Sequence, residues 1–202
     1  MVKLYFIRHG ESIANTEGII SNRDLPHPLT DKGRLQAQAL AQKLQTESIT
    51  HIYASPILRA AQTAEILAQA LGMPCQIADA LREYDCGELE GKSYHDHKSD
   101  YVRLFTKWLI GKWDSRFEGG ESLLDIRARF VPFIEQLIHE SSATDHIALI
   151  SHGGTLLGTL PTLLKNVDHK FALTHPFENA DIVIAESTPD GLVCSSWCNH
   201  TL

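Results

Sequence analysis

Side chains that could do chemistry stand directly after three apolar stretches of the chain. The three groups are Arg8-His9-Gly10, Ser55-Pro56 with Arg59, and Ser151-His152-Gly153-Gly154. Guanidinium groups bind phosphoryl oxygens well, and a neutral imidazole is a competent nucleophile near neutral pH. Glycine lets backbone N–H groups approach a ligand, and a helix that follows would point its N-terminus there. Together these residue types favour a pocket for a phosphoryl group.

The hydrophobic pattern predicts the elements that must bring these groups together. Apolar runs predict strands over 2–7, 50–54 and 146–151, a short edge strand over 75–78, and a hairpin of 181–186 with 191–197. Apolar residues at helical spacing predict helices over 33–44, 57–71 and 123–137. Thr30 is the expected N-cap of the first helix, and Ser55 followed by Pro56 is the expected start of the second.

This alternation of strands and helices predicts an α/β fold, a three-layer α/β/α sandwich with a mostly parallel central sheet. Ligands in open sheets of this kind bind beyond the carboxyl ends of the strands, so the two arginines and two histidines should converge on one edge. A chain of 202 residues that is 43% hydrophobic can form one substantial core, and we predict a single domain over 1–202.

The stretch 84–120 is less regular than the rest of the chain. It carries aromatic residues among charges and glycines, namely Tyr84, Tyr94, Tyr101, Trp108 and Trp113. We predict a lid-like excursion that partly covers the functional edge of the sheet. The alternative is a plain surface subdomain in which these aromatic side chains form a small core.

Charge and composition favour a small-molecule partner in the cytoplasm. A formal net charge of -7 argues against nucleic acid or an anionic membrane surface as the main partner. No apolar stretch is long enough for a signal peptide or a membrane span. The four cysteines form no Cys-x-x-Cys pair, which favours free thiols in a reducing compartment. No pattern in the sequence indicates an oligomeric state.

Two clusters of possible metal ligands are better explained without a metal. His95-Asp96-His97 lacks a third ligand at a suitable spacing, so an exposed polar loop is expected there. A zinc site could also be formed by Cys194, Cys198 and His200. Cysteine in a strand is usually a small buried apolar residue, so we expect packing there and a loose tail after it. We therefore expect no metal and no other cofactor.

In combination, the motifs resemble the histidine phosphatase superfamily, which contains cofactor-dependent phosphoglycerate mutases and small-molecule phosphatases. The matching stretches follow one another along most of the chain: FIRHGESIANTEG, HPLTDKGRLQAQALAQKL, IYASPILRAAQTAEIL, LREYDCGELEGKSY, GGESLLDIRARF, ALISHGGTL and ENADIVIAE. One difference is Ser21-Asn22, where many relatives have glutamine or glycine in a loop that faces the substrate. The resemblance implies a phosphoglycerate mutase-like fold.

The resemblance also implies a role for individual residues. His9 would accept the phosphoryl group on a ring nitrogen. The residues that would bind the phosphate are Arg8, Asn15, Arg59, His152 and Gly153. The second ring nitrogen of His9 must be held in place, and a backbone carbonyl is the expected partner. The arginine charges nearby should resist protonation of the His9 ring.

The leaving oxygen of an alkyl phosphate needs a proton, which an acidic residue must supply. Spacing alone leaves four candidates open: Glu83, Asp85, Glu88 and Glu90. The family pattern selects Glu83, which would give the proton and later take one from water, and it makes Glu90 a structural partner.

Our hypothesis is a phosphatase that hydrolyses small-molecule phosphomonoesters through a phosphohistidine intermediate, with a small phosphorylated metabolite as its partner. One alternative is a cofactor-dependent phosphoglycerate mutase. Family mutases tend to be longer and carry His-Tyr-Gly after the acid, where this chain has Tyr84-Asp85-Cys86-Gly87. Another alternative is a catalytically silent phosphate-binding regulatory protein, although every catalytic position of the family pattern is filled.

Overall fold

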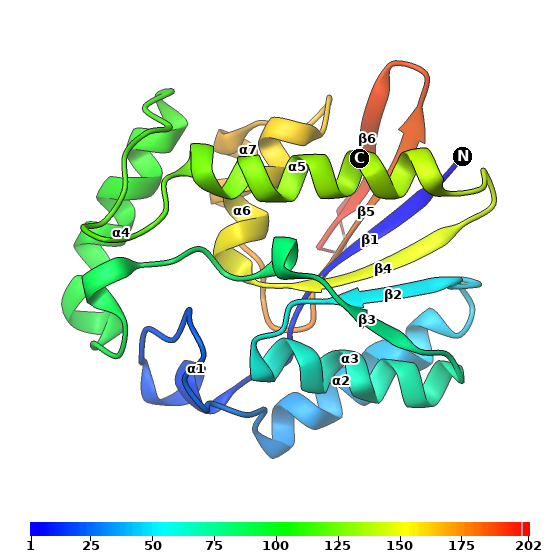
Figure 1. Cartoon of the computed structure of the whole chain (residues 1–202), viewed down its shortest axis with the longest axis horizontal. Coiled ribbons are helices and arrows are strands. Elements are labelled where there is room, and N and C mark those ends of the chain that lie inside the picture. Colours follow the sequence, from blue (N-terminus) through cyan, green and yellow to red (C-terminus); the bar gives the residue numbers. More distant parts are fainter. Residues whose placement is uncertain (199) are drawn as a thin grey trace.

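A central sheet of seven strands runs through the molecule (Figure 1). The computed structural model describes residues 1–198 and 200–202. The strands lie in the order β3-β2-β4-β1-β5-β6-β7, in which the first four are parallel and β5 and β7 run in the opposite direction. Their bounds are β1 (Lys3–Arg8), β2 (His51–Ala54), β3 (Cys75–Ile77), β4 (His146–Ser151), β5 (Ile182–Thr188), β6 (Gly191–Trp197) and β7 (His200–Thr201).

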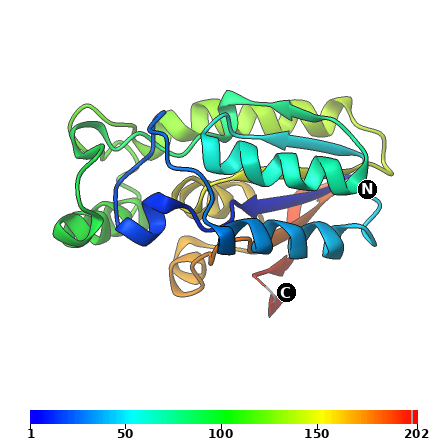
Figure 2. The ribbon, with the colours of Figure 1, turned by 90° about the horizontal axis from the view of Figure 1, so that it is seen from below.

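Helices cover both faces of this sheet, as Figures 1 and 2 show. One face packs against α2 (Asp31–Leu44) and α3 (Leu58–Leu71), the other against α5 (Leu123–Glu140), α6 (Gly153–Leu163) and α7 (His169–Thr174). Side chains of β1 alternate between the two layers, because successive residues of a strand point to opposite faces. Tyr5 and Ile7 lie in the core under α2 and α3, whereas Leu4 and Phe6 lie in the core under α5 and α6. The three-layer α/β/α prediction with a mostly parallel sheet is confirmed.

The start of α2 follows the prediction and the start of α3 does not. The Thr30 hydroxyl accepts a hydrogen bond from the backbone N–H of Gly33, which is the expected N-cap contact. Helix α3 begins at Leu58 with Ile57 as its N-cap, so the prediction of a Ser55-Pro56 start was wrong. The Ser55 hydroxyl is instead bonded to the ring of His152 and to the N–H of Ile57, which holds these residues in a turn before the helix.

Two segments predicted to be irregular are regular. His95-Asp96-His97 lie in the first turn of α4 (Tyr94–Leu109) rather than in a loop, because the Ser93 hydroxyl accepts from the N–H of Asp96 and caps the helix. The predicted loose tail at His200 is also wrong, since β7 pairs with β6. Within the described part of the chain, no group of three His, Cys, Asp or Glu residues could hold a metal ion, and no helix is long and apolar enough to cross a membrane.

The segment 84–120 lies beyond the carboxyl ends of the parallel strands, next to α1 (Ile13–Glu17), with α4 as its main helix (Figures 1 and 2). Two short 3-10 helices, η1 (Asp79–Leu81) and η2 (Gly87–Leu89), precede α4. Tyr84 and Trp108 are buried in a small core that also includes Ile20, Leu123 and Ile126 from outside the segment. The segment is tied to the chain after α1, where the N–H of Tyr94 donates to the Gly18 carbonyl.

Candidate active site

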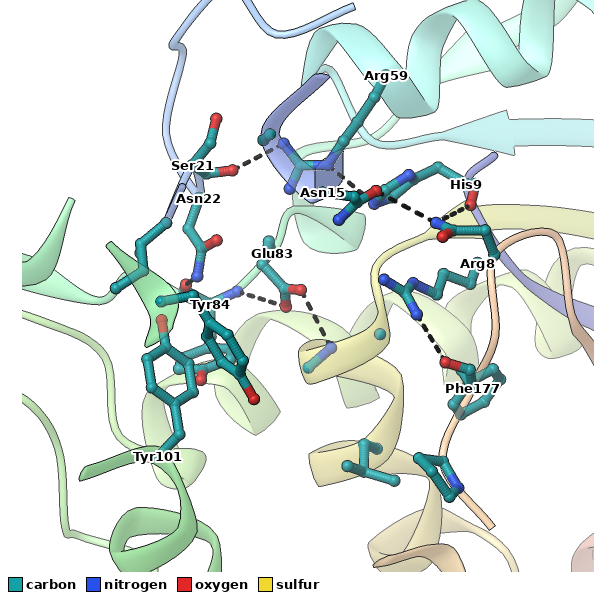
Figure 3. Close-up of a pocket in the computed structure, with 18 of the residues that line it drawn as sticks. Arg8, His9, Asn15, Ser21, Asn22, Arg59, Glu83, Tyr84, Tyr101 and Phe177 are labelled. Atoms are coloured by element: carbon teal, nitrogen blue, oxygen red, sulfur yellow. Dashed lines mark hydrogen bonds between the residues drawn. The ribbon is translucent and has the colours of Figure 1, made fainter. Parts of the chain in front are cut away.

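A cavity of about 490 Å³ opens at this end of the sheet (Figure 3). Six of the seven site residues expected from the sequence line it: Arg8, His9, Asn15, Arg59, Glu83 and Gly153. The seventh, His152, is fully buried behind the cavity, with its ring centroid 5.1 Å from that of His9. The strand ends thus bring together residues far apart in the sequence, because β1, β4 and β2 are parallel neighbours.

The His9 ring is held by contacts on both of its nitrogens. Its Nδ1 lies 2.7 Å from the carbonyl oxygen of Gly10, so Nδ1 carries the proton and donates it to this oxygen. A backbone carbonyl is the partner that the chemistry of a nucleophilic histidine leads us to expect. The Nε2 atom keeps its lone pair and accepts a hydrogen bond of 2.8 Å from Nε of Arg59. The Nε2 lone pair therefore points at the Arg59 guanidinium, a group that can also bind an anion.

Burial and charge keep both histidines of the site neutral. The pKa of His9 lies well below its ordinary value, first because the ring is buried and then because Arg59 and Arg8 are positively charged. Burial and the Arg59 charge also lower the pKa of His152. A neutral His9 carries a lone pair on Nε2 rather than a proton, which is the form that a nucleophile requires.

Backbone carbonyls orient the two guanidinium groups. Nη1 of Arg8, the last residue of β1, donates to the Phe177 carbonyl at 2.6 Å. Nη1 of Arg59, near the start of α3, donates to the Ser21 carbonyl at 2.7 Å. Burial lowers the pKa of Arg59 to about 10, so this side chain stays positively charged at neutral pH. Nε of Arg8 is buried without a hydrogen-bond partner among the described residues, which leaves a donor for an anion.

Glu83 binds the beginning of α6. Its carboxylate accepts hydrogen bonds from the N–H groups of Gly154 at 3.0 Å, Thr155 at 2.6 Å and Tyr84 at 3.1 Å. The first N–H groups of a helix have no partner within the helix, and an anion is favoured there. The expectation that Gly154 brings its N–H to a ligand is therefore wrong in this structure, because Glu83 accepts that hydrogen bond.

Gly154 is required for this contact, since a Cβ atom there would lie 2.4 Å from the Tyr84 ring and 2.9 Å from Oε1 of Glu83. Gly153 has a different neighbour. A Cβ atom at Gly153 would meet Nε of Arg8 at 3.2 Å. Both glycines thus give space to side chains of the site.

The structure separates the four acidic candidates, all of which it describes. Glu83 is the one that lines the cavity. Asp85 pairs with the Arg23 guanidinium, and Glu90 accepts hydrogen bonds from the N–H groups of Asn22 and Arg23, as expected of a structural partner. Glu88 is exposed.

Asn15 is fixed through its amide oxygen. Oδ1 accepts hydrogen bonds from the N–H of Ser12 at 3.0 Å and from Nδ2 of Asn179 at 3.3 Å. Nδ2 of Asn179 also donates to the His9 carbonyl at 3.2 Å. Because its oxygen is engaged, the amide nitrogen of Asn15 is the group left for a ligand.

Sequence reasoning missed several residues of the site. Ser55 was assigned to a helix cap, but its hydroxyl contacts Nε2 of His152 at 2.8 Å. Asn179 lies in the family-like stretch ENADIVIAE, just before the predicted strand 181–186, and no role is predicted for it. Ser21 and Phe177 act through backbone carbonyls, for which side-chain identity gives no signal. Nδ1 of His152 is buried without a hydrogen-bond partner among the described residues, and the ring lies beside that of His9.

Acidification from pH 6.5 to 5 should destabilise the folded protein through His9 and His152. Both pKa values are lowered by folding, so below about pH 6.5 the unfolded chain takes up protons that the folded chain does not. Stability that is present above pH 6.5 is then lost as the pH falls, on the order of 1 kcal/mol per pH unit for each histidine. Urea unfolding at several pH values measures this slope.

The slope should be smaller in a His9→Gln variant, which removes one of the two histidines. The matched control is His139→Gln, because His139 is exposed at the end of α5. Equal slopes for the wild-type protein and His9→Gln would contradict the explanation.

Comparisons with known proteins agree with this architecture. A family model described as "Histidine phosphatase superfamily (branch 1)" matches residues 4–200. The chain is 33% identical over 156 residues to "Putative phosphoserine phosphatase 2" of Hydrogenobacter thermophilus, covering 77% of this chain and 75% of that protein. It is 35% identical over 177 residues to "Probable phosphoglycerate mutase GpmB" of Enterobacter sp. (strain 638), covering 86% of this chain and 81% of that protein.

A solved structure of similar fold is the mycobacterial glucosyl-3-phosphoglycerate phosphatase, with a TM-score of 0.85 and 24% identity over 98% of this chain and 99% of that chain. At this level of identity the likeness concerns the fold.

Proposed function

This chain belongs to the histidine phosphatase superfamily, and from that membership we propose that it hydrolyses small-molecule phosphomonoesters through a phosphohistidine on His9. The observation that carries the proposal is the geometry of His9. Its Nδ1 proton is engaged by a carbonyl, while its Nε2 lone pair faces a buried guanidinium. A nucleophile held beside a positive charge suits attack on an anionic phosphoryl group.

In the first step, the Nε2 lone pair of His9 forms a bond to phosphorus while the bond from phosphorus to the ester oxygen breaks. The electrons of that bond go to the leaving oxygen, which receives a proton from the carboxyl group of Glu83. In the second step, Glu83 takes a proton from water as the water oxygen attacks phosphorus. The N–P bond then breaks, its electrons return to His9, and inorganic phosphate leaves.

Arg8 and Arg59 supply the positive charge for both steps. Phosphoryl transfer passes through a loose transition state, so charge stabilisation and positioning provide most of the rate enhancement. Nε of Arg8 and Nδ1 of His152 are unpartnered among the described residues, and both lie at the His9 end of the site. We assign the binding of phosphoryl oxygens to these groups, with Asn15 and Gly153 at the edge of the same space.

A phosphoglycerate mutase is the second candidate, and the likeness to proteins named GpmB favours it. A mutase would return the phosphoryl group from His9 to a hydroxyl of the substrate instead of passing it to water. The two candidates therefore differ in whether free phosphate appears.

Incubation with 3-phosphoglycerate and with a panel of phosphomonoesters tests both candidates. We expect release of free phosphate, which colorimetry measures, without equilibration of the 2- and 3-isomers, which NMR follows. Activity should survive EDTA, because Arg8 and Arg59 provide the positive charge. Isomerisation faster than phosphate release would favour the mutase, and phosphate binding without turnover of any ester would favour a silent regulatory protein.

A further inference from the structure

One wall of the cavity is aromatic and belongs to α4. Tyr94, Tyr101 and Phe105 are seven and four residues apart, so they lie on one face of this helix, and all three line the cavity. Ile20 and Leu157 line it from the chain after α1 and from α6. We call these five residues the apolar compartment. Figure 3 shows Tyr101 and Tyr84 across the cavity from Arg8 and His9, with Glu83 between them.

One hydroxyl of this wall, that of Tyr101, is engaged within the protein, whereas the hydroxyl of the neighbouring Tyr84 is buried without a hydrogen-bond partner among the described residues. The Tyr101 hydroxyl lies 3.0 Å from the thiol sulfur of Cys86. Nδ2 of Asn22 donates to the Tyr84 carbonyl at 2.9 Å and to the same sulfur at 3.0 Å. The Asn22 amide thus supports the wall, and Tyr94, Tyr101 and Phe105 bring three aromatic rings to the cavity lining.

Positive charge is confined to the phosphate end of the cavity. Among the described residues that line it, the two cations are Arg8 and Arg59, and both stand beside His9. The remaining ionisable acids of the lining are Glu83 and Glu178, neither of which supplies positive charge. A nearby cation, Arg23, is paired with Asp85. A substrate carboxylate in the apolar compartment would lose its water shell without gaining a cation.

We infer that the substrate is the phosphate ester of an uncharged alcohol with an aromatic or other apolar body, which the apolar compartment binds. This inference rests on the proposed phosphatase function. Burial of apolar surface favours such a group, whereas burial of an unpaired charge opposes a phosphorylated hydroxy acid. A cavity of about 490 Å³ is within the usual size range of small-molecule sites.

Two esters of primary alcohols test the inference, namely 2-phenylethyl phosphate and the phosphate ester of 3-hydroxypropanoate. Their leaving groups are both alkoxides, so the chemical step is similar and the difference reports on binding of the alcohol portion. We expect kcat/KM to be at least tenfold higher for 2-phenylethyl phosphate, and higher than for phosphoserine or 3-phosphoglycerate. Equal or higher kcat/KM for the carboxylate esters would overturn the inference.

Variants of α4 connect this preference to the compartment. Phe105→Ala should lower kcat/KM for 2-phenylethyl phosphate about tenfold, mainly through KM, while the carboxylate ester changes little. Tyr94→Arg should raise kcat/KM for the carboxylate ester, since it puts a cation at a half-exposed position of the wall. Val102→Ala is the control, because Val102 is exposed on α4 and is absent from the cavity lining. Equal effects of Phe105→Ala on both esters would contradict the assignment.

A reactive substrate separates failure of the inference from failure of the proposed function. Hydrolysis of 4-nitrophenyl phosphate depends little on how the alcohol portion is bound, because its phenolate is a good leaving group. Turnover of this compound together with a preference for carboxylate esters would refute the inference alone. No turnover of any ester by the folded protein would refute the phosphatase function, and the inference with it.

Discussion

Replacing His9 with alanine should abolish phosphate release from every phosphomonoester, with a loss in kcat on the order of 10⁴-fold or more. Without the imidazole no covalent intermediate can form, whatever the leaving group. Arg8 and Arg59 would still attract the phosphate, so binding should be lost far less than turnover. Continuous assay with 4-nitrophenyl phosphate measures the rate, and calorimetric titration with inorganic phosphate measures the binding.

The control for this experiment is His139→Ala, since His139 is exposed on α5 away from the cavity. Its activity should match that of the wild-type protein. If His9→Ala retained a tenth of the activity, or if phosphate were found on His152 instead, the assignment of His9 as nucleophile would be wrong.

Glu83→Gln should slow the hydrolysis of an alkyl phosphate by roughly two to four orders of magnitude, the usual scale of general acid–base catalysis. Glutamine keeps a carbonyl oxygen that can accept from Gly154 or Thr155, but it cannot transfer a proton. An aryl phosphate with an acidic phenol leaves without much help, so its first step should be comparatively spared. Attack of water on the intermediate still needs a base, so phosphohistidine should accumulate.

Rapid quenching without acid, followed by mass spectrometry, should find an acid-labile phosphate on His9 in the Glu83→Gln protein. Glu88→Gln is the matched control, because Glu88 is a nearby acidic residue with an exposed side chain. Equal slowing of alkyl and aryl substrates in Glu83→Gln would refute the proton-transfer role.

The predictable part of this site follows from strand order. The apolar run before Arg8-His9 is a strand buried between two helix layers, and the stretch before Ser151-His152 is its parallel neighbour. Two buried parallel strands that end on polar residues leave those residues at the same sheet edge, so the site follows from the apolar pattern once the strands are taken as parallel. The guanidinium of Arg59 joins them because its helix follows the next strand.

The parts that sequence reasoning missed depend on contacts without a local signature. The carbonyls of Ser21 and Phe177 orient the two arginines from distant loops, and any residue type supplies a carbonyl. Ser55 is a residue type that often caps helices, yet its hydroxyl contacts His152, which follows the neighbouring strand β4. Helix α4 carries charges among its apolar residues, although the spacing of Tyr94, Tyr101 and Phe105 already fits one helical face.

The position of β1 in the sheet has a consequence for how the protein is made. β1 lies between β4 and β5, so the strand that leads to the proposed nucleophile pairs with residues 146–151 and 182–186. At about 5–20 residues per second, a ribosome takes roughly seven to thirty seconds after β1 to produce its first partner. During that time the apolar run of residues 4–7 has no strand beside it. The proposed nucleophile therefore reaches its place in the sheet only after more than two thirds of the chain has been made.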